Sequence, residues 1–88
     1  MTDFIDRQIS VLNKLVESYR STDITLNVFI LKMESILALP EMFEFRDKLE
    51  DSVSVLEEIN AYLLDGGDNT AAISNKIDEQ INIIEKIL

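Results

Sequence analysis

The sequence contains no cysteine and no histidine. Without cysteine, the chain cannot form disulfides or use a thiol as a nucleophile. Without histidine, it also lacks the commonest general base and the imidazole that many metal sites use as a ligand. Carboxylates are the groups that remain for acid–base chemistry or metal binding. The composition therefore predicts a protein that is not an enzyme and that carries neither a cofactor nor a metal ion.

Long apolar runs are also absent, because no stretch approaches the roughly 18–20 apolar residues that span a bilayer. The first residues, Met1–Asp6, carry acids where a signal peptide carries positive charge. Bases are scarce, with 17 acids against 8 bases and a net charge of −9. Phosphate backbones and anionic membranes repel such a chain, since Lys and Arg supply the affinity for them. We expect a cytoplasmic protein that binds neither nucleic acid nor membranes and whose partner is basic.

Glycine and proline are rare, with two residues and one residue, and no stretch shows the alternation of a strand. Instead, apolar residues recur at steps of three and four, which is the spacing of an amphipathic helix. Four such stripes predict helices over residues 3–20, 25–38, 41–64 and 70–87. The breaks between them hold residues that begin or end helices: Thr2, Asp23 or Thr25, Pro40, the Gly66-Gly67 pair, and Asn69 or Thr70.

The connections between the predicted helices are only about two to five residues long, which forces consecutive helices to lie as antiparallel neighbours. The sequence therefore predicts an all-α fold, an antiparallel four-helix bundle. Residues 1–88 are expected to form a single helical domain. Because a chain this short buries only part of its surface and has no disulfides, packing of the apolar stripes must supply its stability.

Negative charge gathers in residues 41–68, where nine acids oppose only Arg46 and Lys48 and the net charge is −7. A helical wheel for the third predicted helix, with Leu49 set toward the core, shows where these acids point. Five acids point directly away from the core, at about 160–220°: Glu44, Asp47, Asp51, Glu58 and Asp65. Two more lie on the flank of the helix, near about 80–100°: Glu50 and Glu57.

A charged helix face is often only a solvated surface, and that interpretation stays open. However, like charges spaced three, four or seven residues apart repel each other and destabilise the helix slightly. A carboxylate metal site would need acids that face the interior of the bundle, and none does. A role in binding a partner therefore explains the acidic face better than solvation alone.

Two aromatic residues, Phe43 and Tyr62, lie beside the acidic face and off the core stripe. Aromatic side chains rimmed by charge are typical of interface anchors. Packing under the turn before the third helix is an equally good interpretation of Phe43. Asn60 points toward the core, where it needs hydrogen-bond partners. The predicted partner-binding residues are Glu44, Asp47, Asp51, Glu58, Tyr62 and Asp65.

Asp51-Ser52-Val53, followed by Leu56-Glu57-Glu58, resembles the Asp-Ser-Leu site and acidic recognition helix of acyl carrier proteins. In that family the serine carries phosphopantetheine and the acidic residues meet basic partner enzymes. Here Ser52 lies inside a run of helical apolar spacing, at the edge of the core stripe, where a prosthetic arm could hardly be attached. A carrier protein modified on Ser52 stays open as an alternative, although this position is unfavourable to it. A generic helical adaptor is another alternative.

Three further segments carry a second resemblance: Tyr19-Arg20 with Ile24-Thr25-Leu26, Met33-Glu34-Ser35-Ile36-Leu37, and Leu56-Glu57-Glu58-Ile59-Asn60-Ala61. Taken together, they resemble small helical immunity proteins of contact-dependent growth-inhibition and related polymorphic toxin systems of bacteria. The resemblance spans most of the chain and implies a toxin inhibitor, or antitoxin, that binds the toxin domain of its own system, often a nuclease. A nuclease cleft is basic because it holds phosphate backbones. Such proteins share no binding motif, so the wheel alone assigns the site residues.

Overall fold

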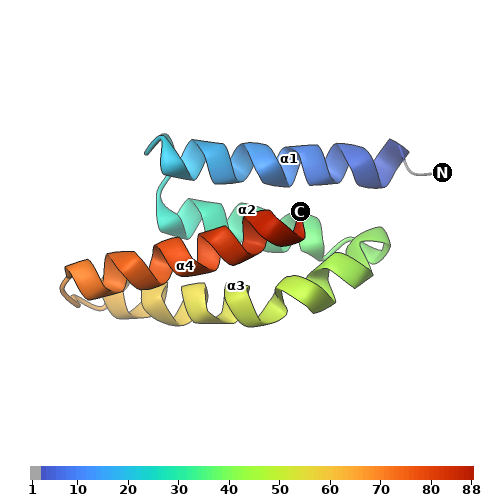
Figure 1. Ribbon diagram of the computed structural model, residues 1–88. Helices are drawn as coiled ribbons and strands as arrows, with labels where there is room; N and C mark the ends of the chain where they lie inside the picture. The colour runs from blue at the N-terminus through green and yellow to red at the C-terminus, as the bar shows by residue number, and fades with distance from the viewer. Residues whose placement is uncertain (1–2) are drawn as a thin grey trace.

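The computed structural model describes residues 3–88, which form four α-helices joined by short turns (Figure 1). The helices are α1 (Asp3–Arg20), α2 (Leu26–Leu37), α3 (Phe43–Leu64) and α4 (Ala71–Ile87), with a short 3-10 helix, η1 (Pro40–Met42), before α3. No β-strand occurs within residues 3–88. The all-helical prediction is therefore confirmed, whereas Thr2, the expected cap of α1, lies outside the described residues.

Threonine caps begin α2 and α4. The Thr25 hydroxyl accepts a hydrogen bond from the Val28 N–H at 3.2 Å, and the Thr70 hydroxyl accepts one from the Ile73 N–H at 3.3 Å. Each bond satisfies a backbone donor that has no partner inside the first turn of its helix. The sequence left two candidates open at each start, and in both places the threonine is the cap.

The third α-helix begins at Phe43, two residues later than the predicted start at residue 41. Proline fixes the backbone at Pro40, and the next residues close a tighter turn in which the Phe43 N–H donates to the Pro40 carbonyl. Pro40 therefore opens the segment, as the sequence predicts, but it opens a 3-10 turn rather than the α-helix itself.

Gly66 ends α3 in the left-handed region, with φ 92°. Glycine adopts this conformation without steric cost because it has no Cβ. The Gly67 N–H donates to the Tyr62 carbonyl at 2.9 Å and the Gly66 N–H donates to the Leu63 carbonyl at 3.2 Å. These two bonds satisfy carbonyls that the last turn of the helix leaves free. The prediction that the glycine pair stops the helix is confirmed.

The turn after α1 has the same hydrogen-bond pattern, but Thr22 stands where the other turn has glycine. The Asp23 N–H donates to the Ser18 carbonyl at 2.9 Å, and the Thr22 N–H donates to the Tyr19 carbonyl at 3.0 Å. Thr22 has φ 62°, which is unfavourable for a β-branched residue. The end of α1 therefore carries backbone strain that the end of α3 avoids.

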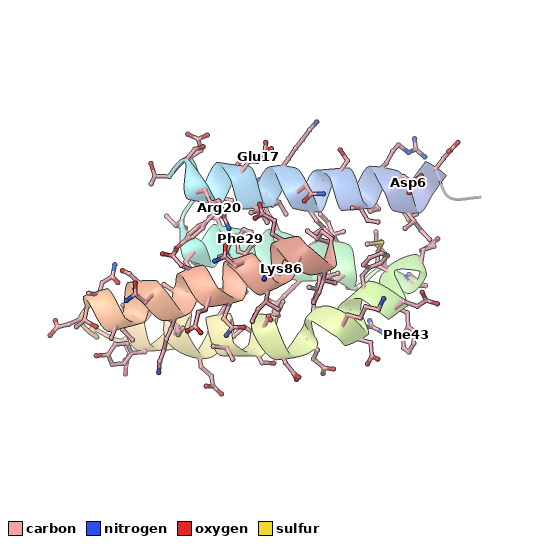
Figure 2. The ribbon with its side chains drawn as sticks, in the orientation of Figure 1. Asp6, Glu17, Arg20, Phe29, Phe43 and Lys86 are labelled. Atoms are coloured by element: carbon pink, nitrogen blue, oxygen red, sulfur yellow. The ribbon has the colours of Figure 1, made fainter. Side chains whose placement is uncertain are left out.

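Apolar side chains from all four α-helices form one core. Its fully buried members include Leu12, Phe29, Met33, Leu49, Leu56 and Ile84. Phe29 lies among the helices in Figure 2, and its ring centroid is 5.5 Å from that of Tyr19. Contacts join α1 to α2, α2 to α3, α3 to α4, and α1 to α4, so the helices close around this core in a molecule of 45 × 23 × 19 Å.

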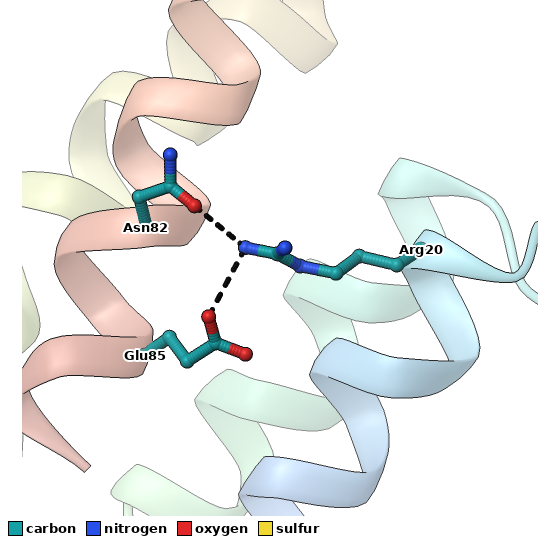
Figure 3. Close-up of polar contacts among 3 residues, drawn as sticks. All are labelled: Arg20, Asn82 and Glu85. Atoms are coloured by element: carbon teal, nitrogen blue, oxygen red, sulfur yellow. Dashed lines mark hydrogen bonds and ion pairs between the residues drawn. The ribbon is translucent and has the colours of Figure 1, made fainter.

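Three polar contacts tie the helices together. The Arg20 guanidinium of α1 donates to Asn82 Oδ1 of α4 at 2.7 Å and lies 3.3 Å from Glu85 Oε1 (Figure 3). Between α2 and α3, Asn60 Nδ2 donates to Asn27 Oδ1 at 2.9 Å. The inward-facing Asn60 therefore has the polar partner that its predicted position requires.

None of the helices in residues 3–88 has the length and apolar character that crossing a bilayer requires.

Candidate functional site

The six predicted partner-binding residues are all exposed, and they lie on α3 or directly after it. They do not form one compact site. Glu44 stands near the start of the helix and Asp65 follows its end, and the rise of an α-helix separates them by roughly 30 Å. They form a stripe along the side of α3 that faces away from the core. The wheel prediction that these residues point to solvent is confirmed, but their role in binding is not tested by their position.

The acids of residues 41–68 have no basic partner within the described chain. The one ion pair in residues 3–88 joins Arg20 to Glu85, outside this segment. The segment's own bases lie over aromatic rings, with the Arg46 guanidinium 5.5 Å from the Phe43 ring centroid and the Lys48 ammonium 5.9 Å from that of Phe45. Cations are attracted to the faces of such rings. The negative charge of the segment is therefore left free to attract a basic molecule.

A groove of about 490 Å³ runs between α2 and the first half of α3. Apolar side chains contribute to its lining, together with four acids, one base and one serine. The lining residues are Glu34, Leu37, Ala38, Phe43, Arg46, Asp47, Glu50, Val53, Ser54 and Glu57. Of the predicted site residues, Asp47 alone belongs to this groove. We call the set formed by Glu34, Asp47, Glu50 and Glu57 the acidic rim.

Glu34 and Glu57 form a carboxyl pair across the groove, one from α2 and one from α3. Burial raises the pKa of Glu34, and the neighbouring Glu57 raises it further. Two neighbouring carboxylates repel each other when both are ionised. The pair is therefore a place where a positive charge would be stabilised by both carboxylates.

Phe43 stands at the mouth of the groove with 59% of its surface exposed. Figure 2 shows the side chain at the edge of the molecule. Most of the Phe43 surface is therefore not covered by the turn between α2 and α3, the alternative position that the sequence left open. An exposed aromatic ring beside charged groups is the arrangement that interface anchors have.

Tyr62 lies at the opposite end of α3 and is 49% exposed. Its ring packs against Gly67 so closely that a Cβ at that position would overlap it. Tyr62 and Asp65 line a separate, shallow hollow with the glycine turn. Part of the Tyr62 ring is therefore covered by the glycine turn. Tyr62 does not join Phe43 in one binding surface.

Ser52 is only 5% exposed and lies in the middle of α3. A prosthetic group attached to this hydroxyl would have to displace neighbouring side chains, since interiors are close-packed. The wheel placed Ser52 at the edge of the core stripe, and the structure confirms that placement. The geometry is therefore unfavourable to the carrier-protein alternative.

Sequence reasoning missed the acidic rim as a unit because it treated α3 alone. The wheel did place Glu50 and Glu57 on one flank, but it could not say which helix packs beside that flank. Glu34 gives no sequence signal, since it is a single acid in an apolar helix. The spacing of Glu50 and Glu57, seven residues apart on one side of the helix, was the available signal.

Within residues 3–88, no group of three or more His, Cys, Asp or Glu side chains is arranged to hold a metal ion. No family model matches the chain, and no curated protein or solved structure matches it either.

Proposed function

We propose that this protein is an immunity protein that binds a basic toxin domain, expected to be a nuclease, and neutralises it without catalysing a reaction. The observation that carries the proposal is the exposed and unpaired negative charge of residues 41–68. Both bases of that segment lie over aromatic rings and leave the acids without ion pairs. Such a surface destabilises the free protein slightly and is compensated when a basic surface covers it.

A rigid support for this charge is part of the proposal. We take the four helices as an antiparallel bundle, which the short connections and the shared core favour. A helix packed in such a bundle keeps its acids at fixed spacing, so little side-chain and backbone freedom has to be lost on binding. The toxin would act on nucleic acid inside the cell, and the proposed place of action of this protein is therefore the cytoplasm.

The test uses a toxin domain encoded next to the gene of this protein. The purified domain is assayed for nuclease activity with increasing amounts of this protein, and growth is measured in cells that produce the domain with and without it. We expect activity to fall to background at a one-to-one ratio and growth to recover. A matched experiment with an unrelated nuclease domain of similar charge should show no protection, because charge alone does not supply specificity.

Other outcomes would favour the two alternatives. A gain in intact mass after expression with a phosphopantetheinyl transferase, located on Ser52, would support the carrier protein. A neighbouring toxin domain that keeps full activity in the presence of excess protein would contradict the immunity function and leave a helical adaptor as the better description.

A further inference from the structure

The groove between α2 and α3 combines an apolar wall with an acidic rim. Leu37 and Val53 are buried core residues that also line it, so its wall continues the apolar interior. Its acidic rim places four carboxyl groups around that apolar wall, opposed by Arg46 alone. Arg46 lies over the Phe43 ring at the mouth.

We propose that this groove, rather than the outward stripe of α3, is where the toxin domain docks, with a cationic side chain of the toxin between Glu34 and Glu57 and an apolar side chain against Phe43. The inference rests on the proposed function and assigns its binding site. It divides the acids into two roles, with the rim, Asp47 included, in direct contact and the other outward acids of α3 acting at a distance.

Charge complementarity selects the occupant. Glu34 and Glu57 line the same groove, and two neighbouring carboxylates repel each other unless a proton or a cation lies between them. A guanidinium or ammonium group can bond to both carboxylates at once, and such charge-assisted bonds are stronger than neutral ones. An acidic or wholly apolar segment would leave the rim carboxylates desolvated and unpaired, which is costly.

The apolar part of the occupant follows from Phe43. Phe43 lines the groove and yet keeps 59% of its surface exposed. Covering an exposed aromatic side chain at a groove removes apolar area from water and slows dissociation. The partner segment is therefore amphipathic, with a basic residue and an apolar residue on the same side.

Glu57 and Glu58 provide a matched pair for the test. They are adjacent on α3 and lose the same charge on substitution, but Glu57 lines the groove whereas Glu58 faces away from it. Binding of Glu57→Gln, Glu58→Gln, Glu34→Gln and Phe43→Ala to the toxin domain is measured by surface plasmon resonance. Thermal melting checks that each variant is folded, and because Gln removes repulsion between the two carboxyl groups, neither Gln variant in the groove should lose stability.

We expect Glu57→Gln, Glu34→Gln and Phe43→Ala each to weaken binding by about tenfold or more, mainly through faster dissociation. Glu58→Gln should change the affinity by less than about threefold. If Glu58→Gln weakens binding as much as Glu57→Gln, or if the groove variants bind like wild type, the groove assignment is overturned while the immunity function stands. If wild-type protein binds no toxin domain, the proposed function fails and the groove assignment falls with it.

Discussion

At the scale of single residues, Glu34 makes stability depend on pH. Burial and the neighbouring Glu57 raise its pKa in the folded protein. A carboxyl group with a raised folded-state pKa stabilises the fold below its unfolded pKa, and that contribution is lost as pH rises through the folded value. The free energy of unfolding, measured by urea denaturation, should therefore increase as pH falls from neutral toward about 4.5.

The variant Glu34→Gln isolates this contribution from the other acids. Glu57, Glu50 and Asp47 line the same groove as Glu34, and Arg46 adds a positive charge. Gln cannot ionise, so the stability of Glu34→Gln should exceed that of wild type at neutral pH and depend less on pH. Parallel curves for the two proteins would mean that Glu34 contributes nothing to the pH dependence of stability.

Thr22 holds a left-handed conformation that suits glycine. Replacing it with glycine should relieve strain that exceeds the extra flexibility glycine gives the unfolded chain. Thr22→Gly should therefore raise the free energy of unfolding by about 0.5–1 kcal/mol. Ser21→Gly is the control, because Ser21 has no positive φ and the substitution should lower stability. A decrease in both variants would show that the turn is not strained.

The hydrogen bond between Asn27 and Asn60 links α2 to α3 at a partly buried position. Removing one side chain leaves the other amide without its partner, so Asn60→Ala should lower the free energy of unfolding by roughly 1–2 kcal/mol. The double variant with Asn27→Ala should cost less than the sum of the two single variants, because the orphaned group is then gone. Additive losses in denaturant melts would mean that the two amides do not interact.

At the scale of helices, the apolar stripe of α3 faces the core as the sequence predicts. Leu56 is fully buried and Ile59 is 7% exposed. Leu56→Ala should cost about 2–5 kcal/mol, and Ile59→Ala a similar or smaller amount, against a total stability of about 5–10 kcal/mol. Thermal melting should show Leu56→Ala at least about 10 °C below wild type. Leu64→Ala, the same change at a residue 70% exposed on the same helix, should melt close to wild type.

The helices themselves were predictable because each signal is local. Apolar spacing, Thr25, Thr70 and the glycine pair act within one or two turns, and α1 begins and ends where the sequence predicts. The start of α3 was missed because Pro40 fits both the first turn of an α-helix and the 3-10 turn that forms. That choice depends on how the chain turns between α2 and α3, which no local pattern records.

The candidate site was predictable only in part, for the same reason. A wheel gives directions around one helix, so it found the outward acids of α3. The groove depends on the lateral packing of α2 against α3, which brings Glu34 to Glu57 from 23 positions away in the sequence. Lateral packing is set by how side chains interdigitate between helices, and a single sequence shows that only weakly.

At the scale of the whole molecule, the negative charge is unevenly distributed. Residues 41–68 carry −7 of the net −9, so the negative potential is strongest over α3. Potentials of this kind accelerate association with oppositely charged proteins and are screened by salt beyond about 8–10 Å. In the proposed complex, the outward acids of α3 should therefore control how fast the toxin domain arrives, even where they make no contact with it.

Charge reversals test this directly. Asp51→Lys and Asp6→Lys change the net charge of the protein equally, but Asp51 lies on α3 and Asp6 lies on α1. Asp51→Lys should lower the association rate with the toxin domain several-fold at low salt and weaken its dependence on salt, with little change in dissociation. Asp6→Lys should have a much smaller effect, and Glu17→Lys, also on α1, serves as a second control. Stopped-flow measurements across a salt series give the association rate and its dependence on salt. Equal effects of the α1 and α3 reversals would mean that net charge alone attracts the partner. The outward acids of α3 would then not orient it.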